Sequence, residues 1–269
     1  MRLALLLTAL VLAIGGAARA EESALKRLET GDDSRGWEAV GRLNFGTGGF
    51  CTGTLIAPQL VLTAAHCLFD KDTGARVPPT EIEFLAGWRN GRAAAYRGVR
   101  RTVAHPDYTF DARDRLDRVA HDLALLELDQ PIRLPSIRPF ETDVHPMEGD
   151  EVGVVSYAQD RAEAPSLQEV CHVLGRRPGV LVLTCNVDFG SSGAPIFSIR
   201  DGVARVVSVV SAKAEVDGEK VALGTSLEEP LTVLRSMLDG NIAGAPVVRS
   251  LSATGGAKFV RPEVEPSTP

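Results

Sequence analysis

The fold of this chain is decided by residues 184–197, TCNVDFGSSGAPIF, a polar stretch that lies between two apolar runs. The apolar runs, VLVL before it and IFSI overlapping its end, have the length and composition of buried β-strands, so the stretch between them is predicted to be a loop held at both ends. Gly190 and Gly193 permit backbone conformations that other residues rarely adopt, and they let another molecule approach the main chain closely. The hydroxyl of Ser192 lies between them.

The hydroxyl of Ser192 is a weak nucleophile on its own. A serine attacks a carbonyl effectively only when a base takes its proton and N–H donors stabilise the oxyanion that forms. A catalytic role for this loop therefore requires a histidine and a carboxylate elsewhere in the sequence. Without them, GSSG is an ordinary serine-rich hairpin turn.

Two other strand-like runs supply these groups. The run LTAAHC ends with His66 beside Cys67, and a disulfide at that cysteine would fix the backbone of the histidine. The run VAHDLALLEL is mostly apolar and carries Asp122 at its inner end, where a carboxylate is costly unless it receives hydrogen bonds; an imidazole N–H is a suitable donor. Taken alone, His66 would be a structural histidine. His121 and Asp122 could instead bind a metal, although no further ligands at suitable spacing accompany them.

Length and composition favour a folded, exported protein. With 269 residues and 44% hydrophobic content, the chain can bury a large core as one compact unit or as two small β-domains. Residues 1–20 have the charged start, apolar stretch and small-x-small end of a removable signal peptide. The uncharged run 3–18 is short for a membrane span of about 20 residues, so a retained anchor is the less favoured alternative.

Once this segment is removed, 27 basic and 35 acidic residues remain, a formal charge of −8. This balance gives no support to nucleic-acid binding. The expected location is secreted or periplasmic, without stable membrane insertion of the mature chain.

All four cysteines lie in the exported part, where an oxidising compartment permits disulfides. The spacing suggests that Cys51 pairs with Cys67 and Cys171 with Cys185, and each pair would close a loop of roughly 15 residues worth about 3 kcal/mol in the chain-entropy model. Four cysteines allow three connectivities, so the other pairings remain open. A zinc site at Cys171, His172 and Cys185 lacks the second ligand pair that such sites use.

The remainder of the chain consists of short strand-like runs separated by turns. Residues 21–36 are charged and lack periodicity, which predicts a flexible lead-in. The folded domain is expected at 37–238, with a proline-rich crossover between two halves near 131–147. A short helix is predicted at 230–238, because the proline at its start suits a first helical turn. Residues 239–269 mix Gly, Ala, Ser and Pro without apolar periodicity, so a disordered tail is expected.

Three blocks of the sequence together resemble the catalytic blocks of chymotrypsin-like (trypsin-like) serine proteases, in that family's order of histidine, aspartate and serine. The blocks are LTAAHC around His66, HDLALL around Asp122 and GSSGAP around Ser192. The similarity extends over about 37–238 and includes the motifs CTGTLI and HPDY. It implies an all-β fold of two antiparallel six-stranded β-barrels with the active site in the cleft between them, followed by the predicted short C-terminal helix.

For the site, the resemblance implies a triad that hydrolyses peptide bonds through an acyl-enzyme. Asp122 accepts the Nδ1 proton of His66, Nε2 of the same ring takes the proton of Ser192, and the serine attacks the amide carbonyl. The backbone N–H groups of Gly190 and Ser192 form the oxyanion hole, and Ser211 supports the aspartate. An α/β-hydrolase elbow does not fit, because the histidine precedes the serine in this chain.

The sequence also departs from the animal digestive members of the family. Those relatives become active when an Ile-Val-Gly-Gly terminus pairs with an aspartate before the nucleophile, whereas this chain has Ser191 there and no such terminus before Trp37. We therefore expect no activation of that kind. A closer likeness to bacterial secreted glutamyl-endopeptidase-like members is expected, which Ala194 also suits.

Four residues are expected to bind substrate: Asn186, Ser211, Ala212 and Lys213. Asn186 stands where trypsin-like enzymes keep an aspartate, so cleavage after Arg or Lys is disfavoured. Lys213 stands where glycine usually opens the pocket, and it could block the pocket, attract an acidic side chain or simply be solvated.

We expect a peptide or protein substrate, a monomer, and no cofactor, metal or nucleic-acid partner. The alternative to an enzyme is a catalytically silent binding module with the protease fold.

Overall fold

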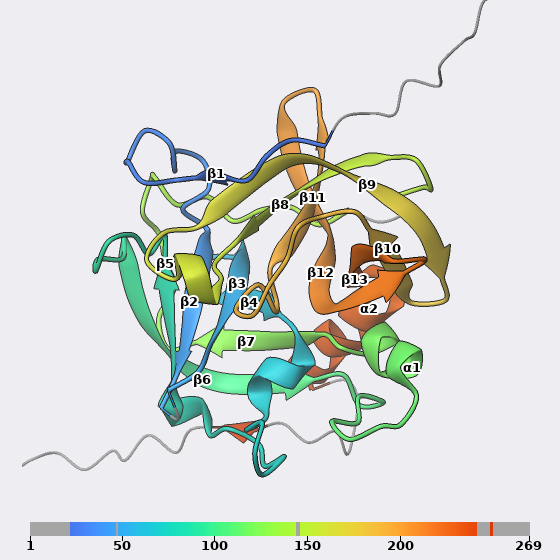
Figure 1. Ribbon diagram of the computed structural model, residues 1–269. Helices are drawn as coiled ribbons and strands as arrows, with labels where there is room; N and C mark the ends of the chain where they lie inside the picture. Colours follow the sequence, from blue (N-terminus) through green and yellow to red (C-terminus); the bar gives the residue numbers. More distant parts are fainter. Residues whose placement is uncertain (1–21, 47, 144–145, 241–247, 250–269) are drawn as a thin grey trace, which may run out of the picture.

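The computed structural model describes residues 22–46, 48–143, 146–240 and 248–249 (Figure 1). The predicted signal peptide at 1–20 lies outside the described residues, as does most of the predicted tail at 239–269. Within the described part, no helix is both long and apolar enough to cross a bilayer. Most of the chain forms two antiparallel β-barrels, which confirms the predicted fold class.

The first barrel has the strand order β6-β5-β2-β3-β4-β7 and is closed by pairing between β6 and β7. Its strands are β2 (Val40–Phe45), β3 (Phe50–Ala57), β4 (Leu60–Thr63), β5 (Ile82–Ala86), β6 (Ala95–Ala104) and β7 (Ala124–Leu128). A two-residue strand, β14 (Val248–Arg249), pairs with β6 at Thr102 and Arg101. Two short 3-10 turns accompany this barrel, η1 (Ala65–Leu68) after β4 and η2 (Pro79–Glu81) before β5.

The second barrel has the order β9-β10-β13-β12-β11-β8 and is closed by pairing between β8 and β9. Its strands are β8 (Glu151–Ser156), β9 (Ser166–Arg177), β10 (Val180–Leu183), β11 (Pro195–Arg200), β12 (Val203–Val216) and β13 (Glu219–Ser226), and a 3-10 turn, η3 (Gln159–Arg161), follows β8. The strands β10 and β11 hold the central loop at both ends, as the apolar runs around it predict.

An aromatic cluster links the two barrels and the segment that connects them. Trp37 precedes the first barrel, Phe140 lies in the connecting segment and Phe197 belongs to β11 of the second barrel. The centroid of the Phe197 ring lies 5.1 Å from that of Trp37 and 4.6 Å from that of Phe140. Because interiors are close-packed, these contacts fix how the loops of one barrel meet those of the other.

The helix α2 (Glu228–Leu238) begins two residues before the predicted 230–238. Its buried face, which includes Leu231, Leu234 and Met237, packs into the hydrophobic cluster that contains the first barrel's core. Since α2 directly follows the last strand of the second barrel, it connects that barrel to the first (Figure 1).

Two local predictions were wrong. Residues 22–36 are not a flexible lead-in, because β1 (Lys26–Arg27) pairs with β9 and Leu28 is only 1% exposed. The densely charged stretch 111–118, for which the sequence predicts a surface loop, contains the start of the helix α1 (Arg115–Ala120), whose first turn is capped by Asp114. The Asp114 side chain accepts two main-chain N–H groups, a cap that stabilises a helix too short to show periodicity.

Both disulfides predicted from spacing are present. Cys51 is bonded to Cys67 and Cys171 to Cys185. The alternative zinc site at Cys171, His172 and Cys185 is thereby excluded, because both sulfur atoms are already bonded.

Candidate active site

Asp122 lies in the turn between α1 and β7 and is 2% exposed. Three donors surround its carboxylate. Nδ1 of His66 lies 2.7 Å from Oδ2, the His66 backbone N–H donates to Oδ1 at 2.8 Å, and the Ser211 hydroxyl donates to Oδ2 at 2.5 Å. A buried carboxylate is stable only with such partners, so the pairing predicted for Asp122 is present in the structure.

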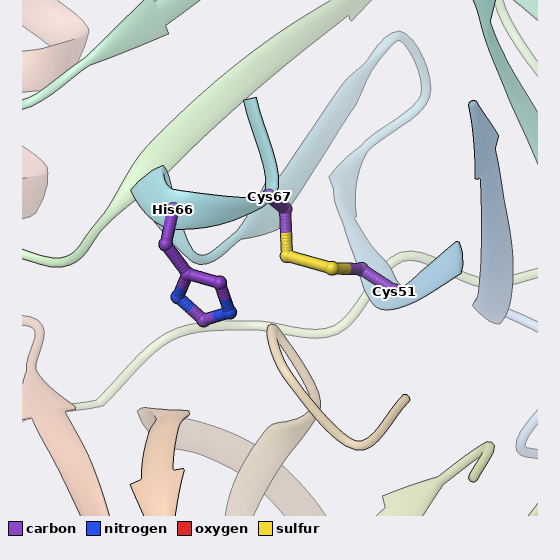
Figure 2. A group of neighbouring side chains, drawn as sticks. All are labelled: Cys51, His66 and Cys67. Carbon is purple, nitrogen blue, oxygen red and sulfur yellow. A yellow bond between two sulfur atoms is a disulfide. The ribbon is translucent and has the colours of Figure 1, made fainter. Parts of the chain in front are cut away.

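The backbone of His66 is fixed by the disulfide of the neighbouring residue. The residue lies in the turn η1, immediately before Cys67, and Figure 2 shows the imidazole and the disulfide to Cys51 extending from this same turn. Although these three side chains lie close together, both sulfur atoms are in the disulfide and are not free to bind a metal. The disulfide therefore anchors the turn that presents the ring.

The other histidine of the HDLALL block has a structural environment. The ring of His121 stacks on that of His105 at 5.0 Å between centroids, and its Nδ1 lies 3.0 Å from the carbonyl of Asp117. Asp122 points instead to His66, so His121 and Asp122 do not act together as a metal-binding dipeptide.

The pKa of His66 is raised above its ordinary value of 6.5. Burial acts to lower it, but the negative charge of Asp122 and the hydrogen bond to that carboxylate outweigh burial, while Arg118 opposes them weakly. With 27% of its side chain exposed, the imidazole remains accessible from solvent.

This raised pKa predicts the acid limb of the pH profile. A general base must be neutral, so activity is expected to fall as pH drops through the pKa of His66 and protonates the ring. The midpoint of the acid limb of kcat/KM, which reports the free enzyme, is expected above 6.5. A midpoint well below that value would contradict the described coupling between His66 and Asp122.

Ser192 lies in the central loop of the second barrel, against the first barrel. The backbone N–H of Thr52 donates to the Ser192 carbonyl at 2.8 Å. A Cβ at Gly193, whose φ is +77°, would lie 2.0 Å from Oγ1 of Thr63 on the strand that precedes His66, so only glycine fits there. Among the described residues, no hydrogen bond joins the Ser192 hydroxyl to His66.

Two main-chain N–H groups of this loop are left for a ligand. The N–H groups of Ser191 and Gly193 bind carbonyl oxygens within the protein, whereas those of Gly190 and Ser192 have no acceptor in the described part of the chain. Gly190 has φ +94°, and a Cβ there would lie 2.4 Å from the ring of Phe50. Gly190 therefore holds a conformation that a larger residue could not adopt, and the two N–H groups without an acceptor are the pair expected to form the oxyanion hole.

Ser191, between these donors, is fully buried and contacts four groups. Its hydroxyl lies 3.2 Å from both the Ser156 hydroxyl and the Tyr157 carbonyl, and it accepts from the Asp188 N–H at 3.3 Å and from Arg161 at 3.4 Å. These contacts, one of them from the Arg161 guanidinium, hold the loop at the position where animal relatives keep an aspartate. Sequence reasoning did not find them, because the partners lie up to 35 residues away.

A pocket of about 190 Å³ opens beside the nucleophile candidate. The residues that line it are Val187, Asp188, Phe189, Ser192, Val210, Ser211, Ala212 and Lys213. Asn186, which is predicted to bind substrate, does not line this pocket. It is exposed and borders an adjoining hollow, which shares Val187, Asp188 and Lys213 with the pocket, and its backbone N–H donates to Oε1 of Gln168.

The Ser211 contact predicts a measurable effect on stability. Ser211→Ala removes a donor to a buried carboxylate and is expected to lower the free energy of unfolding by about 1.5–3 kcal/mol. Ser208→Ala is the matched control, since Ser208 lies on the same strand and donates to the neutral carbonyl of Thr225, and it should cost about 1 kcal/mol. Urea denaturation measures both; equal losses would contradict a special role of the Ser211–Asp122 contact.

A two-barrel fold in which one barrel pairs a solvent-accessible histidine with a buried aspartate and the other barrel packs a glycine-framed serine loop against the first defines the class of chymotrypsin-like serine proteases. Comparison with known proteins agrees. The model of the trypsin-like peptidase domain matches residues 51–207, more than half of the chain, and the chain belongs to this family.

Three curated relatives illustrate the similarity. Coagulation factor IX of Cavia porcellus is 32% identical over 100 residues, which cover 37% of this chain and 32% of the relative. The suppressor of tumorigenicity 14 protein homolog of Bos taurus is 36% identical over 105 residues, 35% of this chain and 11% of the relative. Venom serine protease 34 of Apis mellifera is 27% identical over 121 residues, 41% of this chain and 28% of the relative. The chain thus spans a third or less of the length of each.

Among solved structures, a Glu endopeptidase in complex with MPD aligns with a TM-score of 0.66 and 16% sequence identity. The alignment covers 80% of this chain and 97% of that one. At this level of identity the likeness shows the fold.

Proposed function

We propose that the chain is a secreted serine endopeptidase in which His66, Asp122 and Ser192 form the catalytic triad. The observation that carries this proposal is the buried carboxylate of Asp122, which binds both the ring and the backbone of His66. Because Nδ1–H donates to Asp122, Nε2 keeps its lone pair and can act as the base.

The reaction follows from this tautomer. Nε2 of His66 takes the proton of Ser192 as the serine oxygen bonds to the substrate carbonyl, and the N–H groups of Gly190 and Ser192 receive the negative oxygen. The imidazolium then gives its proton to the leaving amine, which yields an acyl-enzyme. Water, deprotonated by the same nitrogen, releases the acid and regenerates the serine. Each oxyanion donor in such a site contributes on the order of 10²–10³ in kcat.

Location and domain limits belong to the same proposal. The two disulfides and the signal-like residues 1–20 support a secreted or periplasmic protein. We assign the peptidase domain to 37–238, with β1 as an added strand on its second barrel. The substrate is a peptide or a protein, and family membership supports this choice.

One observation favours the alternative of a silent binding module: within the described residues, Ser192 makes no hydrogen bond to His66. Catalytic hydrogen bonds are often long before substrate binds, so the lack of this bond is compatible with catalysis. The two unpaired N–H groups beside Ser192 support catalysis, because they are the donors that the proposed oxyanion hole needs.

The test is the digestion of an unstructured protein by the mature, oxidised chain, with mass spectrometry of the new N-termini. Cleavage that is lost in His66→Ala supports the endopeptidase. If the folded chain binds the substrate but produces no new N-termini, the proposal is wrong and the binding module is correct.

A further inference from the structure

The pocket beside Ser192 has apolar walls and a single ion pair. Val187, Val210 and Ala212 contribute apolar side chains, and of the eight residues that line it, Asp188 and Lys213 are the charged ones. Its volume of about 190 Å³ is below the 300–1,000 Å³ typical of sites for drug-sized ligands. It is therefore suited to one amino-acid side chain of the substrate.

The two charges neutralise each other. Nζ of Lys213 lies 2.7 Å from Oδ1 of Asp188, and the same ammonium lies 4.1 Å from the centre of the Phe189 ring. The hydrogen bond from Lys213 lowers the pKa of Asp188, and a second hydrogen bond from the Phe189 N–H acts in the same direction. The lysine is thus held between a carboxylate and an aromatic face, with about half of its side chain exposed, so a substrate group must compete with Asp188 for it.

A charged substrate side chain is disfavoured in the pocket beside Ser192. An acidic group would have to displace Asp188 from Lys213 and then lie beside a second carboxylate. A basic group would approach the ammonium of Lys213, while the carboxylate that it needs is already engaged. Either charge would also lose water against the valine walls, whereas an apolar side chain gains free energy from that burial.

We propose that this pocket selects an uncharged, apolar side chain on the acyl side of the cleaved bond, and that Asp188 sets this preference by holding Lys213. The inference rests on the proposed function, since it requires Ser192 to be the nucleophile beside the pocket. It replaces the sequence-based options for Lys213, namely blocking, acid binding or solvation, with a paired lysine at the pocket rim.

The experiment uses three peptides that differ only in having Leu, Glu or Lys at that position. The wild-type chain is expected to cleave the Leu peptide with a kcat/KM at least about five-fold higher than the other two. In Asp188→Asn, which keeps an oxygen for the Phe189 N–H but releases Lys213, the Glu/Leu ratio is expected to rise about five-fold, the scale of a half-exposed ion pair.

A reciprocal variant serves as the matched control. Lys213→Gln leaves Asp188 unpaired, so the Lys/Leu ratio should rise by a similar factor while the Glu/Leu ratio does not. Because each ratio is internal to one variant, changes in total activity cancel. If one variant fails to fold, the other still tests the inference.

The outcomes separate this inference from the proposed function. A wild-type preference for Glu or Lys, or unchanged ratios in both variants that still react with a fluorophosphonate, would overturn the pocket assignment and leave the protease intact. A folded chain that cleaves no peptide and does not react with the fluorophosphonate would overturn the proposed function, and the inference with it.

Discussion

Ser192→Ala is expected to lower kcat for peptide hydrolysis on the order of 10⁶-fold, the scale seen when the nucleophile of a Ser-His-Asp enzyme is removed. The reason is local: without the hydroxyl, His66 has no proton to take, and the free N–H groups of the loop can only polarise the substrate. The remaining rate is that of these donors and of binding alone.

The measurement is kcat on the Leu peptide with purified, folded protein. Ser198→Ala is the control, because Ser198 is a mostly buried serine on the adjoining strand β11 that lies outside the site, and its rate is expected to stay close to that of the wild type. A Ser192→Ala protein that keeps more than a tenth of the activity would show that another residue is the nucleophile.

Asp122→Asn is expected to lower kcat on the order of 10⁴-fold, a magnitude taken from the same substitution in the family's own template enzyme. In this chain the carboxylate receives Nδ1–H of His66 at 2.7 Å. An amide at this place can donate to Nδ1, which puts the proton on Nε2 and removes the base from the side facing Ser192.

The control is Asp107→Asn, since Asp107 is an exposed carboxylate in a neighbouring turn with no contact to His66; little loss is expected. The melting temperature of both variants reports whether the fold is kept. If folded Asp122→Asn retained a tenth or more of wild-type activity, the role assigned to the aspartate would be wrong.

Local sequence was sufficient to predict much of this protein. The apolar runs on either side of residues 184–197 became β10 and β11, and the spacing of the cysteines gave both disulfides. The contact between His66 and Asp122 could be predicted because a carboxylate beside a buried apolar run needs a donor; in the structure Asp122 lies in the turn before β7. The resemblance to a known family supplied the barrels.

Other features depend on contacts that no local pattern records. Leu28 is buried beside β1, whose two residues pair with β9. The short helix α1 is held by its Asp114 cap and by the packing of Val119 against the second barrel. Alignment with family positions indicated Asn186 as a pocket residue, but the pocket walls come from Val187 and Val210 on different segments.

Local sequence also could not predict which charged residues form ion pairs. Lys213 was recognised as unusual for its position, yet its partner Asp188 lies 25 residues earlier in the chain. Only the folded structure shows that the two neutralise each other.

The central claim is that Ser192 is an activated nucleophile, and covalent labelling tests it most directly. The mature, oxidised chain is incubated with a fluorophosphonate and analysed by intact mass and peptide mapping. We expect one adduct, located on Ser192, that forms more slowly as the pH falls through the pKa of His66. A correctly folded chain that gains no adduct, or that gains one on a different serine, would contradict it.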